Sequence, residues 1–312
     1  MSPFQFPTPY INPPLLLSAA TGISWSTIPN RQATPEQQLA EQYNLCQRAS
    51  GFVDTAADQV LRATITTEQL KGPGSPRFEI DGIGNATVLL SRSPILQVLG
   101  GQVAPAMPPL QWTTIPANMW VINSPPLGLY GTSVPGDAGE WGQIVTLGGG
   151  YVSTWGGRGS CFLQIEYVNG WPHTSLTAIG NPGDTVLQVD DCTGWAPPPG
   201  LPQGAAGVIY DPSVNSAQET AVVTAASAAS GPGTLTITPA LTWEHQQGII
   251  FTAMPAQLQW AAIIFAVGQA LTRGATATTV QTIGPSAART TDDPYTLMKY
   301  AEEMVHPFKR SR

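Results

Sequence analysis

Charged side chains are scarce in this chain. Only 11% of its 312 residues are Asp, Glu, Lys or Arg, and 20 acidic against 13 basic residues give a net charge of −7. Proteins that bind nucleic acid over most of their surface are strongly basic, so the negative net charge argues against that class. Apolar residues reach 42%, enough for one or two domains with a core. The 32 glycines and 30 prolines indicate strands, turns and extended arms.

Cysteine and histidine are also rare, with three of each. Cys46, Cys161 and Cys192 are odd in number and lack C-x-x-C spacing. This argues against a disulfide framework or a zinc site and predicts buried, reduced thiols. No G-x-S-x-G motif accompanies the histidines, so the sequence indicates no catalytic triad, no cofactor and no enzyme.

Long hydrophobic runs are missing as well. The N-terminal segment has no basic stretch, and Leu15 to Leu17 is too short for the apolar part of a secretion signal. The most apolar stretch, residues 251–271, is interrupted by Pro255, Gln257 and Gln259. This composition predicts a buried helix rather than a membrane span.

Residues 1–33 hold six prolines and show neither helical nor alternating periodicity. We predict an extended N-terminal arm over this range. Such an arm cannot cover its own large side chains, so Phe4, Phe6 and Tyr10 are expected to lie against neighbouring copies at a subunit interface.

A helix start follows at Thr34-Pro35-Glu36-Gln37, which combines an N-cap, a first-turn proline and a capping box. The helix should run to about Ala57. A second helix is expected after Pro255; it has almost no polar face, so Trp260 and Phe265 are expected in a core or at a subunit interface.

A last helix is predicted from about Asp293-Pro294 to His306, again with a cap and a first-turn proline. Its apolar stripe consists of Leu297, Met298, Ala301 and Val305. The tail that follows contains Phe308, Lys309, Arg310 and Arg312.

Alternating or β-branched runs predict strands on both sides of a loop-rich region. Runs before residue 100 are separated by Gly-Pro-Gly and Asp-Gly turns and indicate an antiparallel patch, whereas residues 100–160 suit long loops or hairpins. Five runs within 173–253 predict a small inserted β-domain. The predicted fold class is therefore α+β: a small helical core with antiparallel strands over 34–172 and 254–312, plus the inserted domain and the arm.

Charge is unevenly spread along the chain. Between Ser93 and Thr272 there are nine acids and one base, Arg158. That acidic middle is expected to face solvent or a repelled polyanion, whereas the basic C-terminal tip either seeks an acidic partner or is simply solvated.

Other candidate sites are weaker. His245 follows Glu244 in a turn-like context, and Asp184, Asp190 and Asp191 lack the spacing of a calcium loop. A structural turn is the favoured interpretation for His245, and ordinary surface acids are the favoured interpretation for the three aspartates. The nine tryptophans suit either a sugar-binding platform or, because they are widely dispersed, separate packing anchors.

Five segments have a distinctive order along the chain. The first, AEQYNLCQRASGFVDTAADQVLRATITTEQL, joins a helix to an R-x-T pattern at Arg62 and Thr64. LLSRSPILQV contains Arg92 and Pro94. The remaining segments are LQIEYVNGWP with Tyr167, Gly170 and Trp171, then PAQLQWAAIIFAVGQAL, and finally YAEEMVHPFKR.

Together these segments resemble the head-to-tail connector, or adaptor, proteins of long-tailed double-stranded DNA bacteriophages. They look like that family's opening helix, its R-x-T strand start, its V-x-Y-x-x-G-W strand end, and its later helices. The matching pieces cover about half the chain, whereas residues 100–160 and 173–253 depart from the family pattern.

The resemblance implies a non-enzymatic virion protein, made in the host bacterial cytoplasm and located in the neck between capsid and tail. Its implied partners are the portal protein, neighbouring copies in a ring of twelve, and a tail-side neck or stopper protein. DNA passes through without specific binding, and no membrane is involved. The last helix and tail are the implied portal-docking residues: Leu297, Met298, Ala301, Val305, Phe308, Lys309, Arg310 and Arg312.

Two other functions remain open from the sequence. A β-rich virion protein that binds carbohydrate through loop tryptophans is the main alternative. A hydrolase ranks last, because no acid, base and nucleophile occur at recognisable spacing.

Overall fold

The computed structural model describes most of the chain. The described residues are 7–19, 21–25, 28–30, 32–72, 77–80, 85–106, 109–122, 144–147, 161–197, 203–212, 217–272 and 294–310. Within them the chain forms fourteen β-strands and four α-helices.

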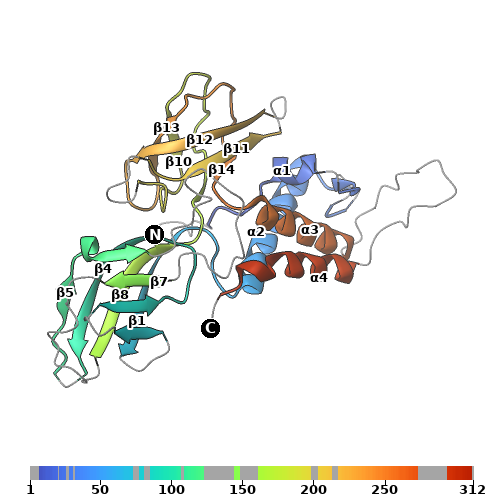
Figure 1. The fold of residues 1–312 in the computed structure, drawn as a ribbon. Helices are drawn as coiled ribbons and strands as arrows, with labels where there is room; N and C mark the ends of the chain where they lie inside the picture. The colour runs from blue at the N-terminus through green and yellow to red at the C-terminus, as the bar shows by residue number, and fades with distance from the viewer. Residues whose placement is uncertain are drawn as a thin grey trace.

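The helices are α1 (Pro13–Ser18), α2 (Pro35–Ala57), α3 (Ala256–Thr272) and α4 (Pro294–Val305), which continues into a short 3-10 turn, η6 (His306–Phe308). The predicted capping box of α2 is confirmed: the Thr34 hydroxyl accepts from the Gln37 amide, and the Gln37 side chain accepts from the Thr34 amide. α2 ends at Asp58, whose φ of 56° is left-handed. α3 lies between α2 and α4 (Figure 1).

Two four-stranded antiparallel sheets share a core. One has the order β1-β8-β4-β5, and the other has the order β2-β3-β7-β6. Their strands are β1 (Thr64–Gly72), β2 (Phe78–Ile80), β3 (Ala86–Leu89), β4 (Ile95–Pro105), β5 (Thr113–Ile115), β6 (Trp120–Ile122), β7 (Ile144–Leu147) and β8 (Cys161–Asn169); the 3-10 turn η2 (Ala117–Met119) precedes β6. The four strands predicted before residue 100 are present, but they do not form a single patch. β2 pairs with β3 in one sheet, whereas β1 and β4 each pair with β8 in the other.

A third, six-stranded antiparallel sheet has the order β10-β13-β12-β11-β14-β9. Its strands are β9 (His173–Ser175), β10 (Val186–Val189), β11 (Ala206–Asp211), β12 (Ala217–Ala226), β13 (Gly233–Thr238) and β14 (Ile250–Thr252). All five strand runs predicted within 173–253 are present, and β9 is an additional strand. In Figure 1 this sheet lies above the helices, and the β1-β8-β4-β5 sheet lies to the lower left.

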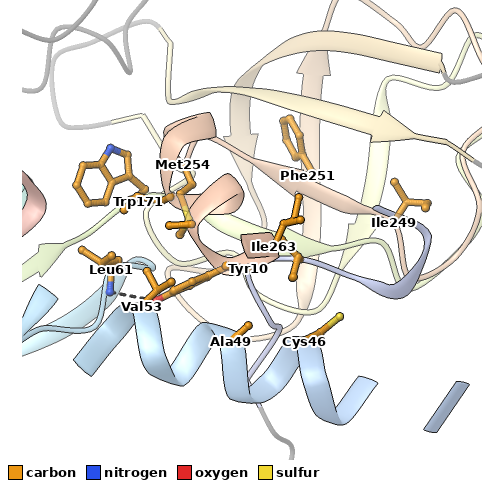
Figure 2. Close-up of a cluster of buried hydrophobic side chains, with 14 of the residues drawn as sticks. Tyr10, Cys46, Ala49, Val53, Leu61, Trp171, Ile249, Phe251, Met254 and Ile263 are labelled. Atoms are coloured by element: carbon orange, nitrogen blue, oxygen red, sulfur yellow. Dashed lines mark hydrogen bonds between the residues drawn. The ribbon is translucent and has the colours of Figure 1, made fainter. Parts of the chain in front are cut away.

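The buried apolar side chains form two clusters. One contains only residues of the two four-stranded sheets and their connections, for example Phe78, Ile115 and Tyr167. The other joins α2, α3 and α4 to the six-stranded sheet, with Val53, Ile263 and Phe251 among its members (Figure 2). The helices therefore cover one part of the molecule, and strands alone build the other core.

The predicted α+β class with a small helical core is therefore wrong. The described chain is mostly β, with three antiparallel sheets. Much of the difference arises within residues 100–160, where β4 extends to Pro105 and is followed by β5, β6 and β7. These strands are short, so their alternation was too weak to distinguish from loops; residues 123–143 and 148–160 lie outside the described range.

The extended N-terminal arm in that fold class is also wrong for the described part of the segment. Tyr10, Ile11 and Leu16 are fully buried within the same chain, and Pro13 opens α1, whose N-cap Asn12 accepts from the Leu15 amide. The chain's own helices and sheet provide the cover that the prediction assigned to neighbouring copies. Phe4 and Phe6 lie outside the described residues.

Gly170, in the family-like segment, offers a first test of the fold. Its φ is +93°, and a Cβ there would lie 2.4 Å from the carbonyl oxygen of Arg62. Gly183 has nearly the same φ, +91°, with nothing within 4 Å of a Cβ. We expect Gly183→Ala to lower the free energy of unfolding by about 1–2 kcal/mol, because of its backbone conformation alone. Gly170→Ala should lower it by about 3 kcal/mol or more, because the added Cβ also meets the Arg62 carbonyl. Urea unfolding of both variants measures the difference, and equal losses would contradict the close approach.

Candidate functional site

Residues 8–12 form a clasp, the name used below, between elements that are distant in sequence. The Thr8 hydroxyl donates to Asp190, which follows β10. The Tyr10 amide donates to Ser50 Oγ on α2 over 2.8 Å, and the Asn12 side chain donates to the carbonyl of Gly248 over 3.1 Å. The clasp thus bonds to α2, to the residue that follows β10 and to a residue just before β14.

Tyr10 is the centre of the clasp. Its hydroxyl donates to Asp54 and accepts from the amides of Leu61 and Arg62, each over 3.1 Å. Figure 2 shows its ring passing along α2 near Val53, with the bond to Leu61 dashed. Burial, followed by the nearby Asp54 charge, raises the pKa of Tyr10 well above its ordinary value, so the phenol stays protonated.

His173 holds the other side of the clasp. One ring nitrogen lies 2.8 Å from the carbonyl oxygen of Pro9, and the other lies 2.9 Å from Thr252 Oγ1. Because the Pro9 carbonyl can only accept, the nitrogen facing it carries the proton in a neutral ring. Its edge-on contact with Tyr10, at 5.6 Å between ring centroids, joins the two anchors.

Apart from Tyr10, which was predicted at a subunit interface, the residues of this site were not predicted from the sequence. Asp54 and Ser50 sit in an ordinary amphipathic helix, and His173 was noted only as one of three histidines. Their partners are 40 to 164 residues away, and a single sequence carries no signal for pairings of that range. Pro9 and Tyr10 beside the first helix were the one local hint.

Removing the Tyr10 hydroxyl tests the clasp. We expect Tyr10→Phe to lower the free energy of unfolding by about 1–3 kcal/mol, because the partly buried Arg62 amide and the Asp54 carboxyl lose a hydrogen-bond partner. Tyr43→Phe, on the exposed part of α2, is the matched control and should change stability very little. Urea unfolding measures the free energy of unfolding of both variants. A value for Tyr10→Phe equal to that of the wild type would contradict the stabilising role of the hydroxyl.

Stability should also depend on pH through His173. Burial lowers the pKa of His173 from 6.5 to about 4. Below pH 6.5 His173 binds a proton in the unfolded chain but stays neutral in the folded chain. The free energy of unfolding therefore falls between about pH 6.5 and pH 4, by roughly 3 kcal/mol in all.

Two carboxyls modify this profile. The pKa of Asp54 is raised, chiefly by burial, so its protonation in acid opposes the loss. Burial alone would raise the pKa of Asp190, but bonds from Ser175 and Thr174 outweigh burial and lower it, which adds to the loss. The comparison is therefore between the wild type and His173→Gln, whose profile should be flatter between pH 6.5 and 4, with exposed His306→Gln as the control. Parallel profiles for all three proteins would contradict the assignment.

The apolar stripe predicted for portal docking packs against the rest of the same chain. Gly268 on α3 permits this, because a Cβ there would lie only 3.0 Å from Met298 Cγ. Phe308 packs edge-on against Trp171 at 5.6 Å between centroids. The stripe residues in or against the helix–sheet core are Leu297, Met298, Ala301 and Val305.

The basic tip is accessible. Lys309 is exposed and Arg310 half-buried, and the Arg310 amide donates to the carbonyl of Ala57 over 2.7 Å. Arg312 lies outside the described residues. Portal docking by this set of residues stays a prediction.

The predicted subunit-interface residues divide in a similar way. Tyr10 and Phe265 are buried in the chain's own core, with the Phe265 ring stacked on Phe52 at 3.8 Å between centroids. Trp260, on the same helix as Phe265, is 39% exposed. Other exposed large apolar side chains on the helices are Leu17 of α1, Leu39 and Tyr43 of α2, and Tyr295 and Tyr300 of α4.

The weaker candidates have structural partners. Asp191 accepts from the Thr193 amide and hydroxyl and from the Gly231 amide, and His245 pairs with Glu219 rather than Glu244. Among the described residues, no group of three His, Cys, Asp or Glu side chains is placed to hold a metal ion. The three cysteines are buried thiols, and burial raises the pKa of Cys46 to about 12.

A cavity of about 300 Å³ lies between the N-terminal segment, the six-stranded sheet and the start of α3. Its walls include Leu15, Val208, Tyr210 and Met254, and none of its lining residues is charged. Such a lining suits neither an ion nor a nucleotide. In the described part of the chain, no helix is long and apolar enough to cross a membrane.

Comparison with known proteins adds no further information. No family model matches the chain, and neither a curated protein nor a solved structure is significantly similar to it.

Proposed function

We propose that this chain is a structural protein of a long-tailed double-stranded DNA bacteriophage. In this proposal its copies form a ring that joins the portal to the tail and continues the DNA channel. The proposal starts from the resemblance of five sequence segments to the connector family and gives the chain no catalytic role.

One observation carries the proposal: the resembling segments, far apart in sequence, lie side by side. α2 packs on α3 and α3 packs on α4, while β8 pairs with β1 on one side and β4 on the other. The amides of Ala63 and Trp171 link the strand start at Arg62 to the Gly170-Trp171 segment through bonds of 2.7 and 2.8 Å. A contiguous unit of this kind is what a shared fold would require.

Exposed side chains on the helices supply surfaces for contacts between copies. Tyr295 and Tyr300 on α4 are 73% and 51% exposed, and Leu39 and Tyr43 are exposed on α2. A ring is built from heterologous contacts, in which two different faces of the same chain meet. Aromatic side chains are enriched in the cores of such interfaces, and portal contact would use the outer side of α4 with Lys309.

Ring assembly tests the proposal directly. Mass photometry of the purified full-length chain, alone and with purified portal rings, is expected to show a closed oligomer. The double variant Leu39→Glu/Tyr43→Glu should reduce it to smaller species, because two charges would be buried without partners. Val121→Glu, at an exposed position on β6 remote in sequence from the helices, is the matched control and should assemble normally. Single copies under both conditions would contradict the proposal.

A further inference from the structure

The loop between β13 and β14 displays an aromatic side chain on a fixed backbone. The Trp243 loop, defined as residues 242–246, leaves the Trp243 side chain 48% exposed. Glu219 on β12 accepts from the amides of Thr242 and Trp243 over 2.7 and 2.6 Å. Asp211 on β11 accepts from the Gln246 amide over 2.8 Å. Two carboxylates from neighbouring strands therefore hold this loop.

His245 fixes the loop from within. Its ring is fully buried, with Nε2 3.1 Å from Glu219 Oε1. Its backbone amide and carbonyl pair with the carbonyl and amide of Gly180 over 2.8 and 2.9 Å. The residue before this bridge, Ile179, is exposed. The indole of Trp243 is thus presented by a backbone that is bonded on both sides.

This arrangement has a cost that stability of the fold does not explain. Removing two carboxylates from water is unfavourable unless they are fully hydrogen-bonded, and leaving an indole in water forgoes the gain of burying it. A fixed loop with an exposed aromatic ring loses little entropy when it binds. The chemistry around the ring indicates which ligand class suits it.

The surroundings are acidic, polar and free of cations. Residues 173–253 contain six Asp or Glu and neither Lys nor Arg, which disfavours phosphate, sulfate and nucleic acid as ligands. Thr242 and Glu244, which flank Trp243 in the sequence, are exposed, and Gln246 is half-buried, with its Nε2 2.6 Å from Glu244 Oε1. A carboxylate and an amide together accept from and donate to hydroxyl groups.

We propose that the Trp243 loop is a binding site for a neutral saccharide. The electron-rich indole face takes the C–H face of a sugar ring, and Glu244 and Gln246 bond its hydroxyls. The site goes beyond the ring function and does not depend on it. Glu244 is exposed in this loop, and its charge repels nucleic acid from the same surface.

Titration of the full-length chain with neutral oligosaccharides tests the site. The probes are cello-, chito- and malto-oligosaccharides and a neutral glycan array, with a sulfated oligosaccharide as the negative probe. At least one neutral probe should bind by calorimetry. Trp243→Ala should weaken that binding about ten-fold or more, whereas Trp260→Ala, which removes a comparably exposed indole from α3, should leave it unchanged. Circular dichroism checks that both variants fold.

Three results would overturn the proposal. They are absence of binding to every neutral probe, equal binding by the wild type and Trp243→Ala, and preferred binding of the sulfated probe. Mass photometry of the same variants separates this site from ring assembly: a loss of oligomer in Trp243→Ala alone would assign the loop to contacts between copies and would also overturn it.

Discussion

The Tyr10 hydroxyl is the point at which the N-terminal segment, α2 and the start of the first sheet are joined. It donates a hydrogen bond to Asp54 and accepts from two consecutive amides, of Leu61 and Arg62. Asp54 also accepts from the Leu61 amide over 3.0 Å. Because α2 ends at Ala57 and β1 begins at Thr64, these bonds set the direction in which the chain leaves the helix. The path of β1, and with it the pairing of β8 and β4, follows from that direction.

The same constraint explains why the helices and the six-stranded sheet share one core. Pro9 and Thr8, next to Tyr10, bond to His173 and Asp190, so the segment that fixes α2 also fixes β9 and β10. Ile263 and Phe251 then close the space between helix and sheet. A neutral His173 is a requirement of this packing, since a charged imidazole would be buried without a carboxylate bonded to it. The clasp is therefore sensitive to acid through His173.

Local features of the fold were predictable from the sequence, and long-range ones were not. Thr34, Pro35 and Gln37 are adjacent, so their capping geometry is visible in four residues, and the runs within 173–253 show alternation over several residues each. By contrast, β7 (Ile144–Leu147) is a four-residue strand that pairs with β3 and β6, and nothing near it in sequence indicates those partners. The buried state of Ala301 and Val305 is a related case: a stripe shows that a helix has an apolar face, but not whether its own chain or another covers it.

The Trp243 loop shows why candidate binding residues were harder to predict than the fold elements. The sequence alone does not show which of the nine tryptophans are exposed. Trp25, Trp120, Trp171 and Trp195 are buried packing residues, as their dispersion had indicated. Trp243 differs because Glu219 and Asp211, 23 to 35 residues away from the backbone amides that they bind, hold its loop in place. Those acids look like surface charges in the sequence. In the folded chain these two acids hold the backbone of the loop in place. Part of the acidity of residues 173–253 therefore shapes one end of the six-stranded sheet and does not form a solvated face. Residues 173–253 contain no Lys or Arg, so they provide no basic surface that would hold DNA in the proposed channel.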